Sequence, residues 1–147
     1  EICSKENMII VDTGFWLALR NENDSFHARA LACLNKYDSE RFVTTWPVMT
    51  ETFYLLSSRV GYQDAIAFLK AYKAQAFSVF DIEVENSDRL IQLCQKYCDL
   101  PMDLADASLV LLAEHLGHGN IFSTDRRDFN TYRWKQHNPF NNLLLLH

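Results

Sequence analysis

The chain has 147 residues, a formal net charge of −5 at pH 7 and a hydrophobic content of 48%. A single domain of this length buries a sizeable core, and the acidic balance argues against a protein that holds nucleic acid through a broad basic face. The charge does not exclude an enzyme that meets phosphates through metal ions, because the metals supply positive charge locally.

The first half of the chain alternates short apolar runs with helical patterns. Residues 1–7 lack a hydrophobic segment and a start methionine, and we interpret them as a processed or added leader before one domain over residues 8–147. Apolar periodicity, caps and breakers then predict a strand at 8–11, helices at 15–20 and about 26–34, a strand at 42–46, and helices at 47–59 and 62–75.

The second half continues the alternation. The predicted elements are a strand at 77–82, a helix from 87, a strongly apolar helix at 103–116 that Gly117 and Gly119 end, a strand at 121–124 and a candidate last strand at 143–146. Strands that alternate with helices are typical of an α/β sandwich with a largely parallel sheet.

Two of the predicted strands are followed by an aspartate, Asp12 after 8–11 and Asp125 after 121–124. Sites in parallel α/β sheets lie at the carboxyl ends of the strands. We therefore expect Asp12 and Asp125 to lie on the same edge of the sheet. Taken singly, each is also explained as a turn or cap residue, which is a common role of aspartate.

The helix predicted at 103–116 begins with two further acids, Asp103 and Asp106. They are three residues apart and share a face at the amino end of a helix that is apolar nearly all round and therefore buried. Asp103 as a helix cap, with Asp106 reaching back to it, explains both without a metal. A carboxylate at the mouth of so buried a helix nevertheless needs a cation or hydrogen-bond donors to compensate it.

Glu51, the fourth acid, lies in the second turn of the helix that Pro47 begins. It flanks an apolar stripe, so a position at the rim of the core explains it when it is taken alone. Four distant segments, however, each bring a carboxylate to where a parallel sheet gathers them, and clustered carboxylates repel one another unless cations lie among them. Oxygen ligands of this kind suit Mg²⁺ or Mn²⁺, and the matching chemistry is phosphodiester hydrolysis assisted by two ions ~4 Å apart.

Four short motifs follow one another along the chain: I-I-V-D-T-G at 9–14, T-E at 50–51, D-L-A-D-A-S-L-V at 103–110 and S-T-D-R-R-D-F at 123–129. Their order and spacing resemble the PIN-domain family, and within it the VapC-type toxins of prokaryotic toxin–antitoxin pairs. Asp24 and His27 also fit a D-x-x-H pattern that is frequent in this family. The match runs from Met8 to about Arg133.

The resemblance implies a compact three-layer α/β/α sandwich with a central, largely parallel sheet, often in a homodimer. The implied activity is cleavage of RNA with Mg²⁺ or Mn²⁺, held in check by a cognate antitoxin protein. Carried over by position, the catalytic acids are Asp12, Glu51, Asp106 and Asp125, of which all but Glu51 ligate metal. Glu51 would hold a metal-bound water.

Further residues receive secondary roles from the same resemblance. Asp128 is a rival of Asp125 for the fourth acid, and Asp103 is an outer ligand or a cap. Thr13 and Thr124 are the hydroxyls expected beside the acids. The expected contacts to RNA phosphate are Arg126 and Arg127.

Three alternatives stay open. A PIN fold with a degenerate site would serve protein contact, and a housekeeping nuclease would process RNA without an antitoxin. A phosphatase of the haloacid-dehalogenase type would need an acid two residues after Asp12, where the chain has Gly14.

The cysteines and the hydropathy bear on location. Cys3, Cys33, Cys94 and Cys98 form neither a disulfide framework nor a C-x-x-C zinc pattern, so we interpret them as thiols in a reducing cytoplasm. No apolar run approaches the ~20 residues of a membrane helix, and no contact with a membrane is expected.

Overall fold

A five-stranded sheet lies at the centre of the computed structural model, which describes residues 4–146. Its strand order is β3-β2-β1-β4-β7, and every neighbouring pair in it is parallel, as predicted. The strands are β1 (Met8–Val11), β2 (Arg41–Thr45), β3 (Ser78–Phe80), β4 (Asn120–Phe122) and β7 (Asn141–Asn142). A separate antiparallel hairpin joins β5 (Arg133–Trp134) to β6 (Asn138–Pro139).

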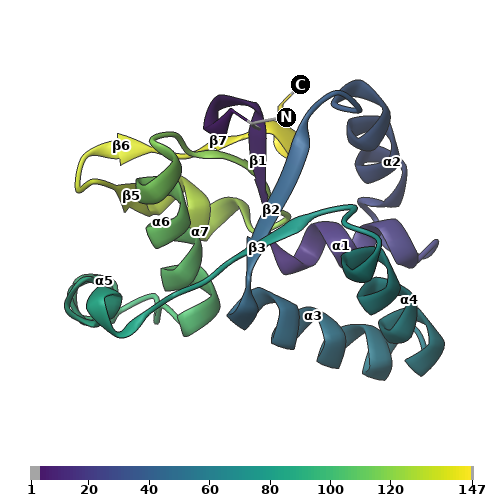
Figure 1. Cartoon of the computed structure of the whole chain (residues 1–147), viewed down its shortest axis with the longest axis horizontal. Helices are drawn as coiled ribbons and strands as arrows, with labels where there is room; N and C mark the ends of the chain where they lie inside the picture. The colour runs from purple at the N-terminus through teal and green to yellow at the C-terminus, as the bar shows by residue number, and fades with distance from the viewer. Residues whose placement is uncertain (1–3, 147) are drawn as a thin grey trace.

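Helices cover both faces of the sheet, which confirms the three-layer α/β/α sandwich. Figure 1 shows α1, α2 and α4 to one side of the sheet and α5, α6 and α7 to the other, with α3 below. The helices are α1 (Thr13–Arg20), α2 (His27–Lys36), α3 (Trp46–Arg59), α4 (Tyr62–Lys73), α5 (Ser87–Lys96), α6 (Leu104–Leu116) and α7 (Arg126–Thr131). Short 3-10 turns are η1 (Lys5–Asn7), η2 (Val84–Asn86) and η3 (Leu143–Leu145).

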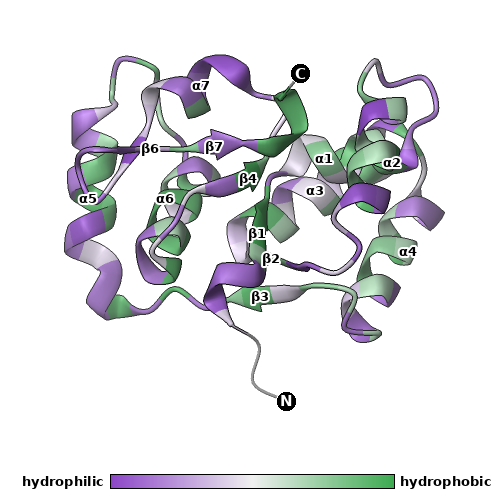
Figure 2. Ribbon diagram, turned by 90° about the horizontal axis from the view of Figure 1, so that it is seen from above, coloured by the Kyte–Doolittle hydropathy of each residue, from purple (hydrophilic) through white to green (hydrophobic). Residues whose placement is uncertain are grey.

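The centre of the core is formed by β1 and α6. Ile9, Ile10 and Val11 are all nearly inaccessible, because a central strand of a parallel sheet is covered on both faces. In Figure 2 the ribbon of β1 is apolar, whereas that of β7 at the edge of the sheet is polar. The apolar helix α6 packs on β1 and β2 and ends at Gly117, whose positive φ of 79° suits glycine.

The strand order reverses beside β1. From β1 the chain adds β2 and β3 on one side of the sheet, and it later places β4 and β7 on the other. In open parallel sheets the connections leave a crevice at such a reversal, at the carboxyl ends of the two strands. Asp12 follows β1 directly, and Ser123, Thr124 and Asp125 follow β4.

Three details differ from the sequence predictions. The predicted last strand at 143–146 is wrong: the last strand is β7, and the leucines form η3, with Leu144 buried in the core. Periodicity alone does not separate a short apolar strand from a buried turn. The strand predicted at 121–124 ends at Phe122, and the unpredicted helix α7 begins at Arg126, so Asp125 caps a helix instead of ending a strand. The strand predicted at 77–82 is limited to β3.

Lys5, near the start of the described residues, contacts the end of α6 and the residues that follow it. The amino group of Lys5 donates to the carbonyl oxygen of His115, and the Nε2 atom of His118 lies 2.8 Å from the Lys5 carbonyl oxygen. The proposed leader at residues 1–7 lies partly outside the described residues. Within residues 4–146 no helix has the length and hydropathy to cross a membrane. Cys33, Cys94 and Cys98 are free thiols, and Cys3 lies outside the described part.

Candidate active site

Asp12 lies at the junction of β1 and α1, at the reversal of the strand order. Its backbone N–H donates to the Phe122 carbonyl oxygen, and its Oδ1 accepts a hydrogen bond from the Thr13 N–H at 2.8 Å, which caps α1. Only 8% of the residue is exposed. The local sequence thus places a buried carboxylate at the carboxyl end of β1, with hydrogen bonds to the backbone on both sides.

Ser123 connects Asp12 to the loop after β4. Its hydroxyl donates to Asp12 Oδ2 at 2.9 Å and accepts from the Asp125 N–H at 3.0 Å. A Cβ atom on Gly14 would collide with Thr124 Oγ1, so glycine at this position lets the first turn of α1 approach the same loop. The loops after β1 and β4 therefore form one unit.

Asp106 lies in the first turn of α6, within electrostatic range of Asp12. The Asp106 N–H donates to Asp103 Oδ1 at 2.8 Å, which confirms Asp103 as the cap of this helix. The Asp106 side chain turns instead toward Tyr132, whose hydroxyl donates to Asp106 Oδ2 at 2.7 Å. Tyr132 is fully buried, so this hydrogen bond fixes the Asp106 side chain to the core.

The two acids around the start of α7 have different surroundings. Asp125 is half-buried and caps α7 by accepting a hydrogen bond from the Asp128 N–H at 3.0 Å. Asp128 is buried to 8% exposure and accepts from Arg127 Nε at 3.1 Å. The Arg127 side chain itself is 74% exposed, and Arg126 is exposed beside it.

Glu51 lies in α3, which begins directly after β2. It is half-buried, and its charge raises the pKa of Asp12. The next residue, Thr52, is fully buried and donates its hydroxyl to Thr13 Oγ1 at 3.3 Å. That bond joins α3 to the start of α1.

The acids form one electrostatic group. Burial raises the pKa of Asp12 from 3.8 to about 6, and repulsion from Glu51 and Asp125 adds to the rise. Burial likewise raises the pKa of Asp106 to about 7, against the hydrogen bond from Tyr132 that lowers it, and Asp103, Asp12 and Asp128 repel it further. The pKa of Asp125 is also raised, mainly by burial. All four predicted acids are therefore brought together, with Asp103 and Asp128 beside them.

A divalent cation fits the chemistry of this group. Asp12 and Asp106 accept hydrogen bonds, but neither forms an ion pair with a basic side chain in residues 4–146, so no opposite charge in this part of the chain balances them. Among these residues no three acidic, histidine or cysteine side chains already surround one point closely enough to hold a metal. Mg²⁺ keeps several of its waters and needs only one or two direct carboxylates, so the arrangement fits such an ion with water completing its shell.

Tyr132→Phe is expected to slow any reaction at this site about tenfold and to lower the free energy of unfolding by about 1–2 kcal/mol, because a carboxylate loses a buried donor. Urea unfolding and cleavage rates measure the two effects. Tyr97→Phe is the matched control: Tyr97 is buried, and its hydroxyl accepts from the Arg133 N–H and has no hydrogen bond to an acid among residues 4–146. We expect it to lose stability at full activity. An equal loss of activity in both variants would contradict a role of Tyr132 through Asp106.

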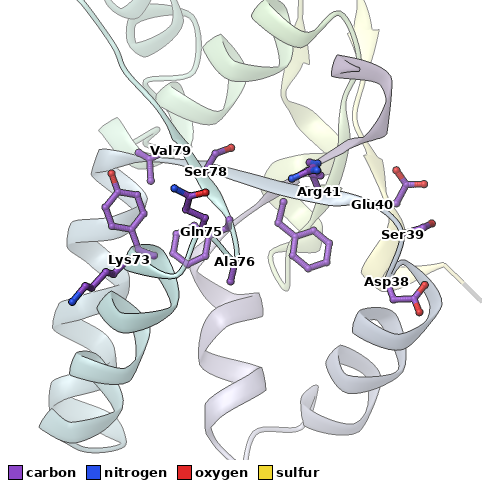
Figure 3. Close-up of a pocket in the computed structure, with 12 residues that line it drawn as sticks. Asp38, Ser39, Glu40, Arg41, Lys73, Gln75, Ala76, Ser78 and Val79 are labelled. Atoms are coloured by element: carbon purple, nitrogen blue, oxygen red, sulfur yellow. The ribbon is translucent and has the colours of Figure 1, made fainter. Parts of the chain in front are cut away.

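The D-x-x-H pattern and a hollow at the start of β2 and β3 both lie apart from the acids. Asp24 accepts from the Phe26 N–H, and the Nδ1 atom of His27 lies 2.6 Å from the Ala18 carbonyl oxygen, so the D-x-x-H pattern fixes the connection of α1 to α2. A hollow of about 820 Å³ lies where β2 and β3 begin, with Arg41 and Ser78 among its lining residues (Figure 3). It occupies the end of the sheet opposite the acids.

The structure adds three residues that were not predicted from the sequence: Ser123, Tyr132 and Asn142. Ser123 stands within the fourth motif, next to Thr124, and this was the available signal. Tyr132 and Asn142 lie 26 and 19 residues from their partners Asp106 and Ser123, outside any motif. Only the fold brings these pairs together.

The PIN-domain family model matches residues 9–135. The chain belongs to the PIN-domain family. This PIN domain is 27% identical over 125 residues to ribonuclease VapC26 of Mycobacterium tuberculosis (strain ATCC 25618 / H37Rv), a match that covers 85% of this chain and 92% of the relative. The crystal structure of Mycobacterium tuberculosis VapC20, a sarcin-ricin loop cleaving toxin, matches with a TM-score of 0.71 and 24% identity over 81% of this chain and 91% of that chain. Because the identity is 24%, the similarity to VapC20 shows a shared fold and nothing further.

Proposed function

We propose that this PIN domain is an endoribonuclease of the VapC toxin type that hydrolyses RNA phosphodiester bonds with Mg²⁺ or Mn²⁺. The observation that carries the proposal is the pair Asp12 and Asp106, a buried and a half-buried carboxylate whose pKa values are both raised. Asp12 repels Asp106, and neither has a basic partner among residues 4–146. Family membership and the similarity to a ribonuclease indicate the reaction class.

Asp12, Asp106 and Asp125 would hold the metal. Each oxygen of Asp12 and the Oδ2 atom of Asp106 accept a hydrogen bond from the protein, and each has a second lone pair for a ligand. When bound, the metal supplies an activated water and stabilises the leaving oxygen. Glu51, on α3 and within electrostatic range of Asp12, would orient that water and accept its proton.

Arg126 and Arg127 would contact the RNA backbone. Both are exposed at the amino end of α7, directly after Asp125, where a scissile phosphate would approach the acids. Because the net charge is −5, such local contacts and the metal, not a broad basic face, would attract the substrate. A cognate antitoxin, a homodimer and action in the cytoplasm complete the proposal.

Incubation of the protein with RNA of mixed sequence tests the activity. We expect cleavage with Mg²⁺ or Mn²⁺ and none with EDTA. Glu51→Gln is expected to lower the rate about a hundredfold, because the substitution removes a proton acceptor. Glu85→Gln, on an exposed glutamate in η2, is the control and should cleave at the rate of the unmodified protein. Cleavage that persists in EDTA, or an unchanged rate with Glu51→Gln, would contradict the proposal.

A further inference from the structure

Ser123 is the one side chain in residues 4–146 that bonds both to Asp12 and to the backbone of Asp125. Its hydroxyl donates to Asp12 Oδ2 and accepts from the Asp125 N–H, and the residue is fully buried. A shift of Ser123 would therefore change the orientation of one acid and the path of the loop that carries the other. The position of Ser123 therefore determines how Asp12 and Asp125 lie relative to each other.

Asn142 in β7 holds Ser123 in turn. Its Oδ1 accepts from the Ser123 N–H at 3.2 Å, and its Nδ2 donates to the Ser123 carbonyl oxygen at 2.9 Å. One amide side chain thus satisfies both backbone groups of a fully buried residue. An unpaired buried N–H or carbonyl is costly, so the two bonds define where Ser123 lies.

These bonds follow the backbone pairing of β4 with β7, which ends two residues before Ser123. The strands β4 and β7 pair through Asn120 with Asn141 and Ile121 with Asn142. After Asn142 the chain turns into η3, so no further residue of β7 reaches Ser123. The Asn142 side chain therefore extends the pairing of the sheet to the loop of the acids.

The segment that carries Asn142 is firmly placed on both sides. Before it, the Asn141 N–H donates to the Gly119 carbonyl oxygen at 2.8 Å. After it, Leu144 is 1% exposed, and η3 packs against β4 and α2. Substitution of the Asn142 side chain would thus leave these anchors in place and remove only the two bonds to Ser123.

We infer that Asn142 is a positioning residue of the active site, which acts through Ser123 on Asp12 and Asp125. The inference rests on the proposed function for its link to metal and RNA. Asn142 lies outside the residues 9–135 that the family model matches. The end of the chain thus completes the site that the four motifs build.

The test compares Asn142→Ala with its neighbour Asn141→Ala, in which an exposed side chain loses only a bond to Asn120 Oδ1. In metal-free protein, hydrogen exchange at the Ser123 and Asp125 amides is expected to accelerate about tenfold in Asn142→Ala and to stay unchanged in Asn141→Ala. Mn²⁺ affinity is expected to fall about tenfold in Asn142→Ala alone, since groups that orient metal ligands have effects of this size.

Asn142→Leu serves if the alanine variant does not fold, because leucine keeps the side-chain volume and lacks both bonds. Equal exchange and equal Mn²⁺ affinity in the variants at 142 and 141 would overturn the inference. Failure of the unmodified protein to bind Mn²⁺ would instead overturn the proposed function. Exchange at Ser123 and Asp125 would still decide whether Asn142 positions the loop.

Discussion

Asp12→Asn is expected to reduce RNA cleavage at least about a thousandfold and, without metal, to stabilise the fold. Asparagine removes the charged ligand, and the loss of metal catalysis amounts to several kcal/mol of transition-state stabilisation. Asparagine still caps a helix well and keeps an oxygen for the Thr13 N–H. The rise in the pKa of Asp12 from 3.8 to about 6 corresponds to at most roughly 3 kcal/mol of destabilisation at neutral pH, which the substitution relieves.

Cleavage rates and urea unfolding in EDTA measure both effects. Asp24→Asn is the matched control, because Asp24 is a half-buried acid that accepts a backbone hydrogen bond away from the cluster. We expect it to change neither quantity substantially. An Asp12→Asn protein that is inactive but strongly destabilised would show that Asp12 is needed for folding. A variant that cleaves RNA at the normal rate would show that Asp12 is not a catalytic residue.

The metal-free protein is expected to lose stability as the pH rises from about 4 to about 7. Burial raises the pKa values of Asp12 and Asp106 in the folded state to about 6 and about 7, above the value of 3.8 expected when unfolded. Between these values the folded protein binds more protons than the unfolded chain, so the free energy of unfolding falls with pH. The contribution of the two acids is fully present below about pH 4 and is lost above their folded pKa values.

Urea unfolding at a series of pH values, in EDTA and in Mn²⁺, checks the sign. Other groups also titrate, so the informative quantity is the difference between the unmodified protein and Asp12→Asn, which should grow in favour of the variant as the pH rises. Mn²⁺ should reverse the trend, because metal binds the ionised carboxylates and affinity increases as protons leave. A difference that shrinks with pH would contradict the burial of an uncompensated carboxylate.

Most of the fold was predictable because its patterns are local. The strand at 8–11 and the helix at 103–116 are strongly apolar, and their place in the core follows from that composition. The expectation that Asp12 and Asp125 lie on the same edge of the sheet required only that the sheet be parallel. Because β1 and β4 are neighbours, the residues that follow these two strands lie side by side.

The remainder depends on contacts between distant residues. Asn141 and Asn142 have low β propensity, and they form β7 because they pair with β4. Leu144 is buried in the core, but it belongs to the 3-10 turn η3 and not to a strand. The hydrogen bond from Tyr132 to Asp106 arises because Tyr132 directly precedes β5, which packs against α6. No local sequence pattern predicts such contacts between residues that are far apart in the chain.

Mn²⁺ binding to the unmodified protein and to Asp12→Asn, measured by calorimetry at about pH 8 without RNA, tests whether the acids hold a metal. At this pH both buried acids are ionised, and no knowledge of the RNA target is needed. The acid cluster predicts binding to the unmodified protein and a loss of at least about tenfold in affinity in the variant. Equal affinity in both proteins, or no binding to either, would contradict a metal-dependent site at the carboxyl ends of β1 and β4.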